Sequence, residues 1–206
     1  MSGDLPRARR RLFIGLKPPE EDAQRLARRT GPTLRDHGGG APHGMRIYPE
    51  HDLHMTLCFL GAVDAERIPM LEAVLREELR GLNAPELLIA GTGAFPDIQR
   101  PRALWAGVEE IDDCPGRLAA LHNRVLQAAL STGWKRPRAD RTRPFRPHVT
   151  LARVRDGASA DLAVFERLDF AQRWLPVEVA LFESRPDRPE ERYEALSAVP
   201  LVVRPG

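Results

Sequence analysis

The chain has 206 residues, of which 42% are hydrophobic and 29% are charged, with a formal net charge of only +2 at pH 7. This length suits one large domain or two small lobes that share a core, and the composition is typical of a globular protein. The apolar run at residues 12–16 is too short for a secretory leader, and no stretch resembles a membrane span. The two cysteines, Cys58 and Cys114, form neither a spaced ligand set nor a disulfide framework. We therefore expect a cytoplasmic monomer with no membrane partner.

Hydrophobic periodicity and turn residues predict short strands interspersed with helices. Residues 1–10 are expected to be a flexible, basic lead-in. A helix is predicted after Pro18 and Pro19, with Glu20, Glu21 and Asp22 in its first turn. A second helix is predicted with Asp64 as its candidate N-cap and Gly81 as its stop, and Pro69 fits it only in the first turn. Further helices are expected at 115–131 and 161–167, and turns at 91–102. The predicted strands cover residues 11–16, 46–48, 53–60, 87–90, 103–108, 148–154, 177–184 and 193–203. This order favours an α+β fold with mainly antiparallel sheets.

A tetrapeptide of the form His-x-Thr-Leu occurs twice, once at residues 54–57 and once at 148–151. Each copy lies in an apolar run that predicts a β-strand. Successive side chains of a strand point to opposite faces, so each His shares a face with the Thr two positions later. The duplication suggests two related lobes within residues 1–206, taken as a single bilobal domain.

Two imidazoles and two hydroxyls would meet if the two motif strands were neighbours. Because histidine titrates near neutrality, such a site can hold one neutral and one protonated imidazole at the same time. That combination provides a general base and a general acid for a phosphate ester, and it requires neither a metal nor a cofactor. His54, Thr56, His148 and Thr150 are therefore the candidate catalytic residues.

Positive charge is concentrated around the second motif. Residues 135–155 contain eight Lys and Arg residues and one acid, Asp140. This segment would attract an anionic ligand. Arg146, two residues before His148, is the first candidate for a direct phosphate contact, because a guanidinium matches phosphate geometry.

The sequence resembles the 2H phosphoesterases, and within them the bacterial and archaeal RNA 2′,3′-cyclic phosphodiesterases, also called 2′-5′ RNA ligases. The resemblance extends beyond the two motifs to segments in the same order along the chain. They are RLFIGL at 11–16 with Pro18 and Pro19, DLHMTLCFLG at 52–61, GAFP at 93–96, PRALWAGV at 101–108, RPFRPHVTLAR at 143–153 and LFES at 181–184.

The resemblance implies two pseudo-twofold-related lobes whose antiparallel sheets flank a central cleft, with the helices outside. It implies hydrolysis of RNA or nucleoside 2′,3′-cyclic phosphates to 2′-phosphates, with weak reverse 2′-5′ joining as an accompanying activity. His54 is then the proton donor to the leaving 3′ oxygen, and His148 is the acceptor that activates water. The partners implied are RNA 3′ ends or nucleotides that carry a cyclic phosphate.

Three aromatic residues, Phe13, Tyr48 and Trp105, are candidates to stack on a nucleobase, with core packing as the alternative. Arg153 fits the family pattern, yet strict strand alternation puts it on the face opposite His148, which favours a structural role. The same alternation puts Cys58 on the face of His54, where family members often carry a basic residue. A buried, inert thiol is the alternative there.

Two other functions remain open at this point. The chain could be a nucleotide-binding or RNA-end-binding module without useful turnover. It could also be a phosphodiesterase for 2′-5′ oligoadenylates or ADP-ribose cyclic phosphate that uses the same two histidines.

Overall fold

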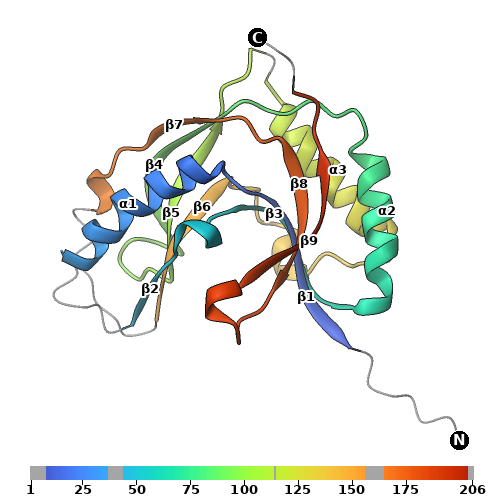
Figure 1. Cartoon of the computed structure of the whole chain (residues 1–206), viewed down its shortest axis with the longest axis horizontal. Helices are drawn as coiled ribbons and strands as arrows, with labels where there is room; N and C mark the ends of the chain where they lie inside the picture. Colours follow the sequence, from blue (N-terminus) through green and yellow to red (C-terminus); the bar gives the residue numbers. More distant parts are fainter. Residues whose placement is uncertain (1–7, 37–43, 114, 156–164, 204–206) are drawn as a thin grey trace, which may run out of the picture.

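The computed structural model describes residues 8–36, 44–113, 115–155 and 165–203. These residues form a mostly antiparallel, curled sheet with three α-helices, which confirms the predicted α+β class (Figure 1). The helices are α1 Glu20–Asp36, α2 Ile68–Glu78 and α3 Arg117–Ser131, and the 3-10 turns are η1 Glu50–Asp52, η2 Ala65–Arg67, η3 Arg138–Asp140, η4 Phe165–Arg167 and η5 Pro189–Glu191. The strands are β1 Arg9–Leu16, β2 Met45–Ile47, β3 Met55–Asp64, β4 Leu87–Phe95, β5 Ala103–Glu110, β6 His148–Val154, β7 Ala171–Trp174, β8 Glu178–Ser184 and β9 Tyr193–Pro200.

The sheet has two related halves that meet at the motif strands. Its order is β7-β4-β5-β6-β3-β1-β8-β9, with β2 added on β6. In each half, the strand beside the motif strand comes earlier in the chain, and a helix lies between the two in the sequence. These strands are β1 and β3, with α1 between them, and β5 and β6, with α3 between them. The motif strands β3 and β6 are joined through the single pair Met55 and Val149. The halves therefore form one continuous sheet, with its narrowest pairing at the centre.

Helices α1 and α3 each follow a strand of one half of the sheet and contact elements of the other half. Helix α1 follows β1 but contacts η1, β2 and η4, and Arg29 of α1 lies 5.5 Å from the ring centre of Phe170, which follows η4. Helix α3 follows β5 but contacts β3 and α2. Figure 1 shows α2 and α3 together on one side of the molecule and α1 on the other. The helices thus tie the two halves together around a shared apolar core.

Several predicted boundaries are wrong, and strand pairing explains most of the differences. Strand β1 begins at Arg9 rather than at residue 11, because Arg9 and Arg10 pair with β3 and the Nε of Arg10 donates a 2.7 Å hydrogen bond to Glu183. Strand β4 continues to Phe95 through the expected turn region, because it pairs with β5 along that length. Strand β7 was not predicted, and it is a short edge strand on β4.

Helix boundaries also differ in detail. Pro69 lies in the first turn of α2, as predicted, but the 3-10 turn η2 separates Asp64 from the helix, so Asp64 is not its N-cap. Gly81, the predicted end of this helix, has a φ of +70°, which favours glycine. Of the helix predicted at 161–167, residues 161–164 lie outside the described residues, and 165–167 form the turn η4. Most of the lead-in expected to be flexible also lies outside them.

Candidate active site

The two motifs lie side by side at the centre of the sheet. His54 immediately precedes β3, and His148 is the first residue of β6. The strands are antiparallel, with Met55 opposite Val149. Continuing this register by one residue on each side puts His54 opposite Thr150 and Thr56 opposite His148. Residues directly opposite on one face of an antiparallel pair have Cβ atoms about 5 Å apart, so the four polar side chains form one group.

Both imidazoles are held in the same way by a backbone carbonyl two residues earlier. The Nδ1 of His54 lies 2.7 Å from the carbonyl oxygen of Asp52, and the Nδ1 of His148 lies 2.7 Å from that of Arg146. A carbonyl oxygen only accepts hydrogen bonds, so Nδ1 carries the proton in both rings. The Nε2 atom of each ring is therefore the one available to take up or release a proton at a ligand.

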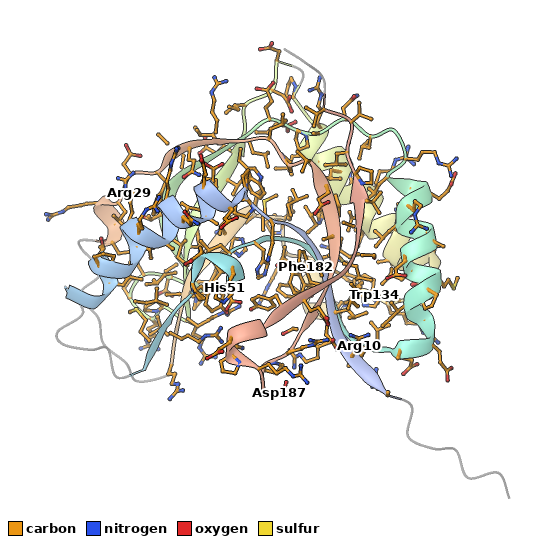
Figure 2. The ribbon with its side chains drawn as sticks, viewed as in Figure 1. Arg10, Arg29, His51, Trp134, Phe182 and Asp187 are labelled. Atoms are coloured by element: carbon orange, nitrogen blue, oxygen red, sulfur yellow. The ribbon has the colours of Figure 1, made fainter. Side chains whose placement is uncertain are left out.

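An aromatic cluster surrounds His54, which is 8% exposed. Its ring centre lies 4.7 Å from that of Phe13 and 4.6 Å from that of Tyr193. Phe182, labelled in Figure 2, stacks on Phe13 at 4.9 Å. These contacts hold the His54 ring in one orientation.

His148, which is partly exposed, has corresponding aromatic neighbours in the other half of the sheet. Its ring centre lies 4.9 Å from that of Phe95 on β4 and 6.0 Å from that of Trp105 on β5. Gly93 makes room for the indole, because a Cβ atom at this position would lie 2.3 Å from the Trp105 ring. Strands β5 and β4 thus support His148 as β1 and β8 support His54.

Burial lowers the pKa of both histidines, although not equally. For His54, burial lowers the pKa from 6.5 to about 4, and the hydrogen bond to Asp52 opposes this effect only in part. For His148, burial also lowers the pKa, again opposed by its backbone hydrogen bond. Nearby positive charges add to the effect of burial: those of Lys17, His148 and Arg153, in this order, lower the pKa of His54, and that of Arg153 lowers the pKa of His148. In the ligand-free protein both imidazoles are therefore neutral at pH 7.

A β-bulge lies at the last residue of each motif and changes which later residues share a face with the motif histidine. The pairing skips Leu57 in β3 and Leu151 in β6, the last residue of each tetrapeptide. Alternation resumes one position later, so Arg153 is exposed although its neighbours Ala152 and Val154 are buried. The prediction that Arg153 lies on the face opposite the histidines is therefore wrong, and its charge acts on both rings.

The first bulge has the matching effect on Cys58 and Phe59. Cys58 is 7% exposed and belongs to the main core, so its predicted place on the His54 face is wrong. Burial raises the pKa of its thiol to about 12, which agrees with the alternative of an inert cysteine. Phe59 is instead 60% exposed, and its ring centre lies 6.0 Å from that of Phe13. Phe59 and Arg153 occupy corresponding positions five residues after each motif histidine, and neither was predicted to lie on the histidine face, because a bulge leaves no clear mark in the sequence.

The other predicted binding residues differ in their availability. Phe13 and Tyr48 are 2% and 6% exposed, so they pack within the protein and offer no free ring face to a base. Trp105 is partly exposed and lies opposite Thr150, beside the site. The Arg146 side chain is exposed, while its backbone carbonyl holds His148.

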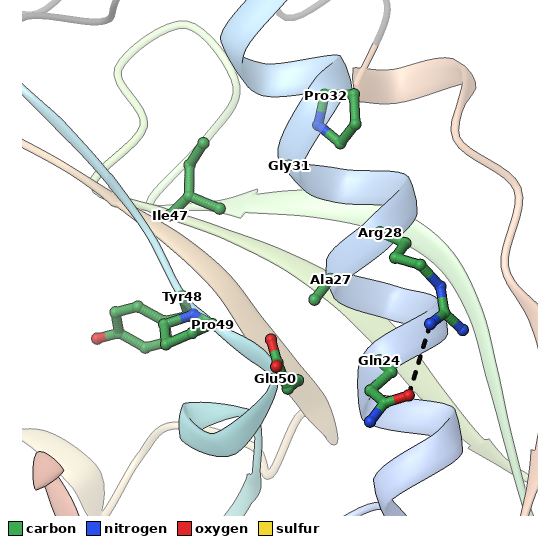
Figure 3. A pocket seen from close by; sticks show the side chains of 9 residues that line it. All are labelled: Gln24, Ala27, Arg28, Gly31, Pro32, Ile47, Tyr48, Pro49 and Glu50. Carbon is green, nitrogen blue, oxygen red and sulfur yellow. Dashed lines mark hydrogen bonds between the residues drawn. The ribbon is translucent and has the colours of Figure 1, made fainter. Parts of the chain in front are cut away.

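A separate cavity of about 520 Å³ lies between α1 and residues 47–50, and neither histidine lines it. Figure 3 shows Ala27 of α1 on the side of residues 47–50 and Arg28 hydrogen-bonded to Gln24, whereas the Tyr48 ring points away from the helix. Within the described ranges, no three His, Cys, Asp or Glu side chains come together as a metal site. No helix in the described part of the chain is long and apolar enough to cross a membrane.

A central pair of His-x-Thr-Leu strands on a curled antiparallel sheet defines the class of two-histidine phosphoesterases. The model of the 2′-5′ RNA ligase superfamily matches residues 18–188. The chain therefore belongs to the 2′-5′ RNA ligase superfamily, as the resemblance of its motifs predicted.

Curated relatives carry the name RNA 2′,3′-cyclic phosphodiesterase. The protein from Geobacillus stearothermophilus is 31% identical over 201 residues, which are 96% of this chain and 59% of that protein. The chain thus spans less than two thirds of that relative. The protein from Archaeoglobus fulgidus is 29% identical over 145 residues, which are 70% of this chain and 73% of that protein.

Solved structures share the fold. The structure of TT0787 from Thermus thermophilus superposes with a TM-score of 0.71 at 28% identity, covering 93% of this chain and 97% of that one. The structure of E. coli LigT complexed with 3′-AMP also gives a TM-score of 0.71, covering 94% of this chain and 99% of that one. Its identity of 23% supports the fold alone.

Proposed function

We propose that this protein hydrolyses 2′,3′-cyclic phosphates, at RNA 3′ ends or on nucleosides, to 2′-phosphates without a metal. The observation that carries the proposal is the pair of histidines on adjoining strands, each with Nδ1 bound to a carbonyl and Nε2 available. The relatives named RNA 2′,3′-cyclic phosphodiesterase support this choice of substrate. E. coli LigT, which this chain resembles in fold, has been solved in complex with 3′-AMP and with ATP.

The proposed reaction is an in-line displacement at phosphorus. The Nε2 of His148 takes a proton from water, the water oxygen bonds to phosphorus, and the bond from phosphorus to the 3′ oxygen breaks. The Nε2 of His54 gives its proton to the leaving 3′ oxygen, so the phosphate remains on the 2′ oxygen. Each proton transfer contributes about 10²–10⁴-fold to the rate. Thr56 and Thr150 donate hydrogen bonds to the non-bridging oxygens as negative charge develops there.

The assignment of His54 as the acid depends on the bound substrate. In the free protein burial lowers the pKa of His54 to about 4, so His54 is neutral at pH 7. A phosphodiester anion placed between the rings favours the imidazolium form and raises the pKa of both histidines. The values for the free protein govern kcat/KM. Because the pKa values of both histidines lie below 6.5, kcat/KM should have its maximum below pH 6.5 and decrease at higher pH, while kcat keeps its maximum at higher pH.

The direct test is to incubate the protein with each nucleoside 2′,3′-cyclic phosphate in the presence of a chelator. Chromatography of the products should give the 2′-phosphate isomer and no 3′-phosphate. An RNA 3′ end with a cyclic phosphate should react in the same way. Recovery of the intact cyclic phosphates after long incubation, with the nucleotide bound, would instead identify a binding module.

A substrate panel separates the enzymatic alternatives. Turnover of 2′-5′ oligoadenylates or ADP-ribose cyclic phosphate with a higher kcat/KM than any 2′,3′-cyclic phosphate would assign that other substrate class to the same two histidines. Weak reverse 2′-5′ joining is proposed as an accompanying activity of the same site. We further propose a cytoplasmic monomer, in keeping with the free, buried thiol of Cys58.

Arg153 is expected to contact the substrate phosphate or base, because it is exposed on the face of the histidines and its charge reaches both rings. Arg153→Met should lower kcat/KM about 10- to 100-fold, the range for losing a charge-assisted hydrogen bond. Arg146→Met tests the other predicted contact in the same assay. Arg76→Met, an exposed change on α2, is the control and should leave kcat/KM unaltered. A wild-type kcat/KM for Arg153→Met would exclude this contact.

A further inference from the structure

The carbonyl that holds His54 belongs to a buried aspartate with a single ion-pair partner among the described residues. Asp52 is 1% exposed, and its Oδ2 accepts a 3.0 Å hydrogen bond from Nη2 of Arg46 on β2. Asp52 ends the turn η1, which packs against α1 and is closed by backbone hydrogen bonds from Asp52 N to Pro49 O and from Leu53 N to Glu50 O. The Arg46–Asp52 pair adds a side-chain contact that ties the residue whose carbonyl oxygen accepts from His54 Nδ1 to strand β2.

Arg46 also reaches His54 by a second route. Its guanidinium lies 4.8 Å from the ring centre of Tyr48, and Tyr193 donates a 3.4 Å hydrogen bond to the Tyr48 hydroxyl. The Tyr193 ring packs edge-on against His54 at 4.6 Å between ring centres. One arginine thus supports both the hydrogen-bond acceptor and the packing surface of the same imidazole.

His148 has no equivalent arrangement within the described residues. Its Nδ1 is bound to the carbonyl of Arg146, whose own side chain is exposed and makes no ion pair in the described part of the chain. Arg46 and Arg153 are paired residues of β2 and β6, and Asp52 forms its ion pair with Arg46. The support is therefore specific to the His54 half of the site.

We propose that Arg46 and Asp52 are positioning residues for His54, which act by holding the Asp52 carbonyl and the Tyr48–Tyr193 pair against its ring. This inference rests on the proposed function, because it assumes that His54 transfers a proton at the substrate. Neither residue touches the substrate. A ring that rotates away from the reacting oxygen loses rate rather than affinity, because a small misplacement of a reacting group lowers turnover without removing binding contacts.

Kinetics of four variants and a matched control test the proposal. Arg46→Met and Asp52→Ala should each lower kcat about 10- to 100-fold while KM stays within about threefold, and the double variant should be no worse than either alone. Arg46→Lys, which keeps the positive charge, should recover part of the lost kcat. The control is Arg117→Met, which breaks a similar pair between a 29%-exposed arginine and the 1%-exposed Asp112 at the start of α3. It should leave kcat unaltered.

Nuclear magnetic resonance of the His54 ring gives a readout that does not need activity. In the wild-type protein the His54 Nδ1 proton should exchange slowly with water, and in Arg46→Met it should exchange at least about tenfold faster, while the His148 ring is unchanged. If Arg46→Met does not fold, Arg46→Lys and Asp52→Asn take its place. A protein without phosphodiesterase activity would contradict the proposed function, but the exchange rates would still decide the positioning role.

Three outcomes would overturn the positioning role. They are a wild-type exchange rate at His54 in Arg46→Met, an equal loss of kcat in Arg46→Met and Arg117→Met, and a rise in KM with kcat unaltered. The last of these would mean that Arg46 binds the substrate directly.

Discussion

Replacing either His54 or His148 by alanine is expected to lower kcat about 10²–10⁴-fold, the loss for removing a general acid or base. The two effects should not multiply in the double variant, because the reaction needs both proton transfers in one step. Nucleotide binding should survive in both single variants, since the threonines and the neighbouring basic residues remain. The measurement is steady-state hydrolysis of a 2′,3′-cyclic nucleotide with a chelator present, together with calorimetric binding of the product.

A substrate with sulfur in place of the 3′ oxygen would separate the two roles. Sulfur leaves as a thiolate that needs no proton, so turnover no longer requires an acid. His54→Ala should therefore hydrolyse this analogue at close to the wild-type rate, whereas His148→Ala should remain impaired. The opposite result would reverse the assignment of donor and acceptor, while leaving two-histidine catalysis in place.

His51→Gln serves as the control for these variants, because His51 is an exposed imidazole three residues before His54 in the chain. Its kcat should equal that of the wild-type protein. Circular dichroism should give the same spectrum for all variants, so that loss of folding is excluded. Substantial hydrolysis by the double variant would contradict the mechanism, since the mechanism assigns both proton transfers to these two imidazoles.

The sequence was sufficient to predict the class of the fold and to single out the two histidines that the structure brings onto adjoining strands. The motif His-x-Thr-Leu occurs twice in apolar surroundings, and strand alternation alone puts each His with its Thr. The structure brings these strands together through Met55 and Val149. The two-residue alternation of a strand therefore predicts correctly which side chains share a face as long as it is applied only to the three residues from each His to its Thr.

The same alternation failed as soon as it was extended past the motif. A bulge at Leu57 and another at Leu151 shift the later residues by one position, which buries Cys58 and exposes Arg153. A bulge depends on how a partner strand pairs, so it could not be read from this sequence. The supporting aromatic residues are also non-local, because Phe95 and Phe182 come from strands β4 and β8 in different halves of the sheet.

The second large effect is expected in the stability of the protein between pH 6.5 and pH 4. Burial lowers the pKa of His54 to about 4 in the folded state, whereas an unfolded histidine titrates near 6.5. Between these values the unfolded chain binds a proton at His54 that the folded protein does not bind. The stabilisation is therefore fully present above pH 6.5 and is lost as the pH falls toward 4, by up to about 3 kcal/mol.

A comparison with His54→Gln isolates this contribution. Burial also lowers the pKa of His122 and His148, and burial raises that of Asp52, so the wild-type curve alone combines several groups. These groups are present in both proteins, so their contributions to the free energy of unfolding largely cancel in the difference. The free energy of unfolding of both proteins is measured by urea denaturation at fixed ionic strength. The wild-type value minus the His54→Gln value should decrease at each step from pH 7 to pH 4.

Parallel curves for the two proteins would mean that His54 titrates normally and is open to water, which would contradict its burial against Phe13 and Tyr193. The expected divergence links stability to mechanism. The aromatic packing that fixes the orientation of Nε2 also excludes water from the ring, so the protein cannot orient this imidazole without disfavouring its charge. Only a bound anion can then supply the proton-donating form, because its charge offsets the same burial that destabilises the protein in acid.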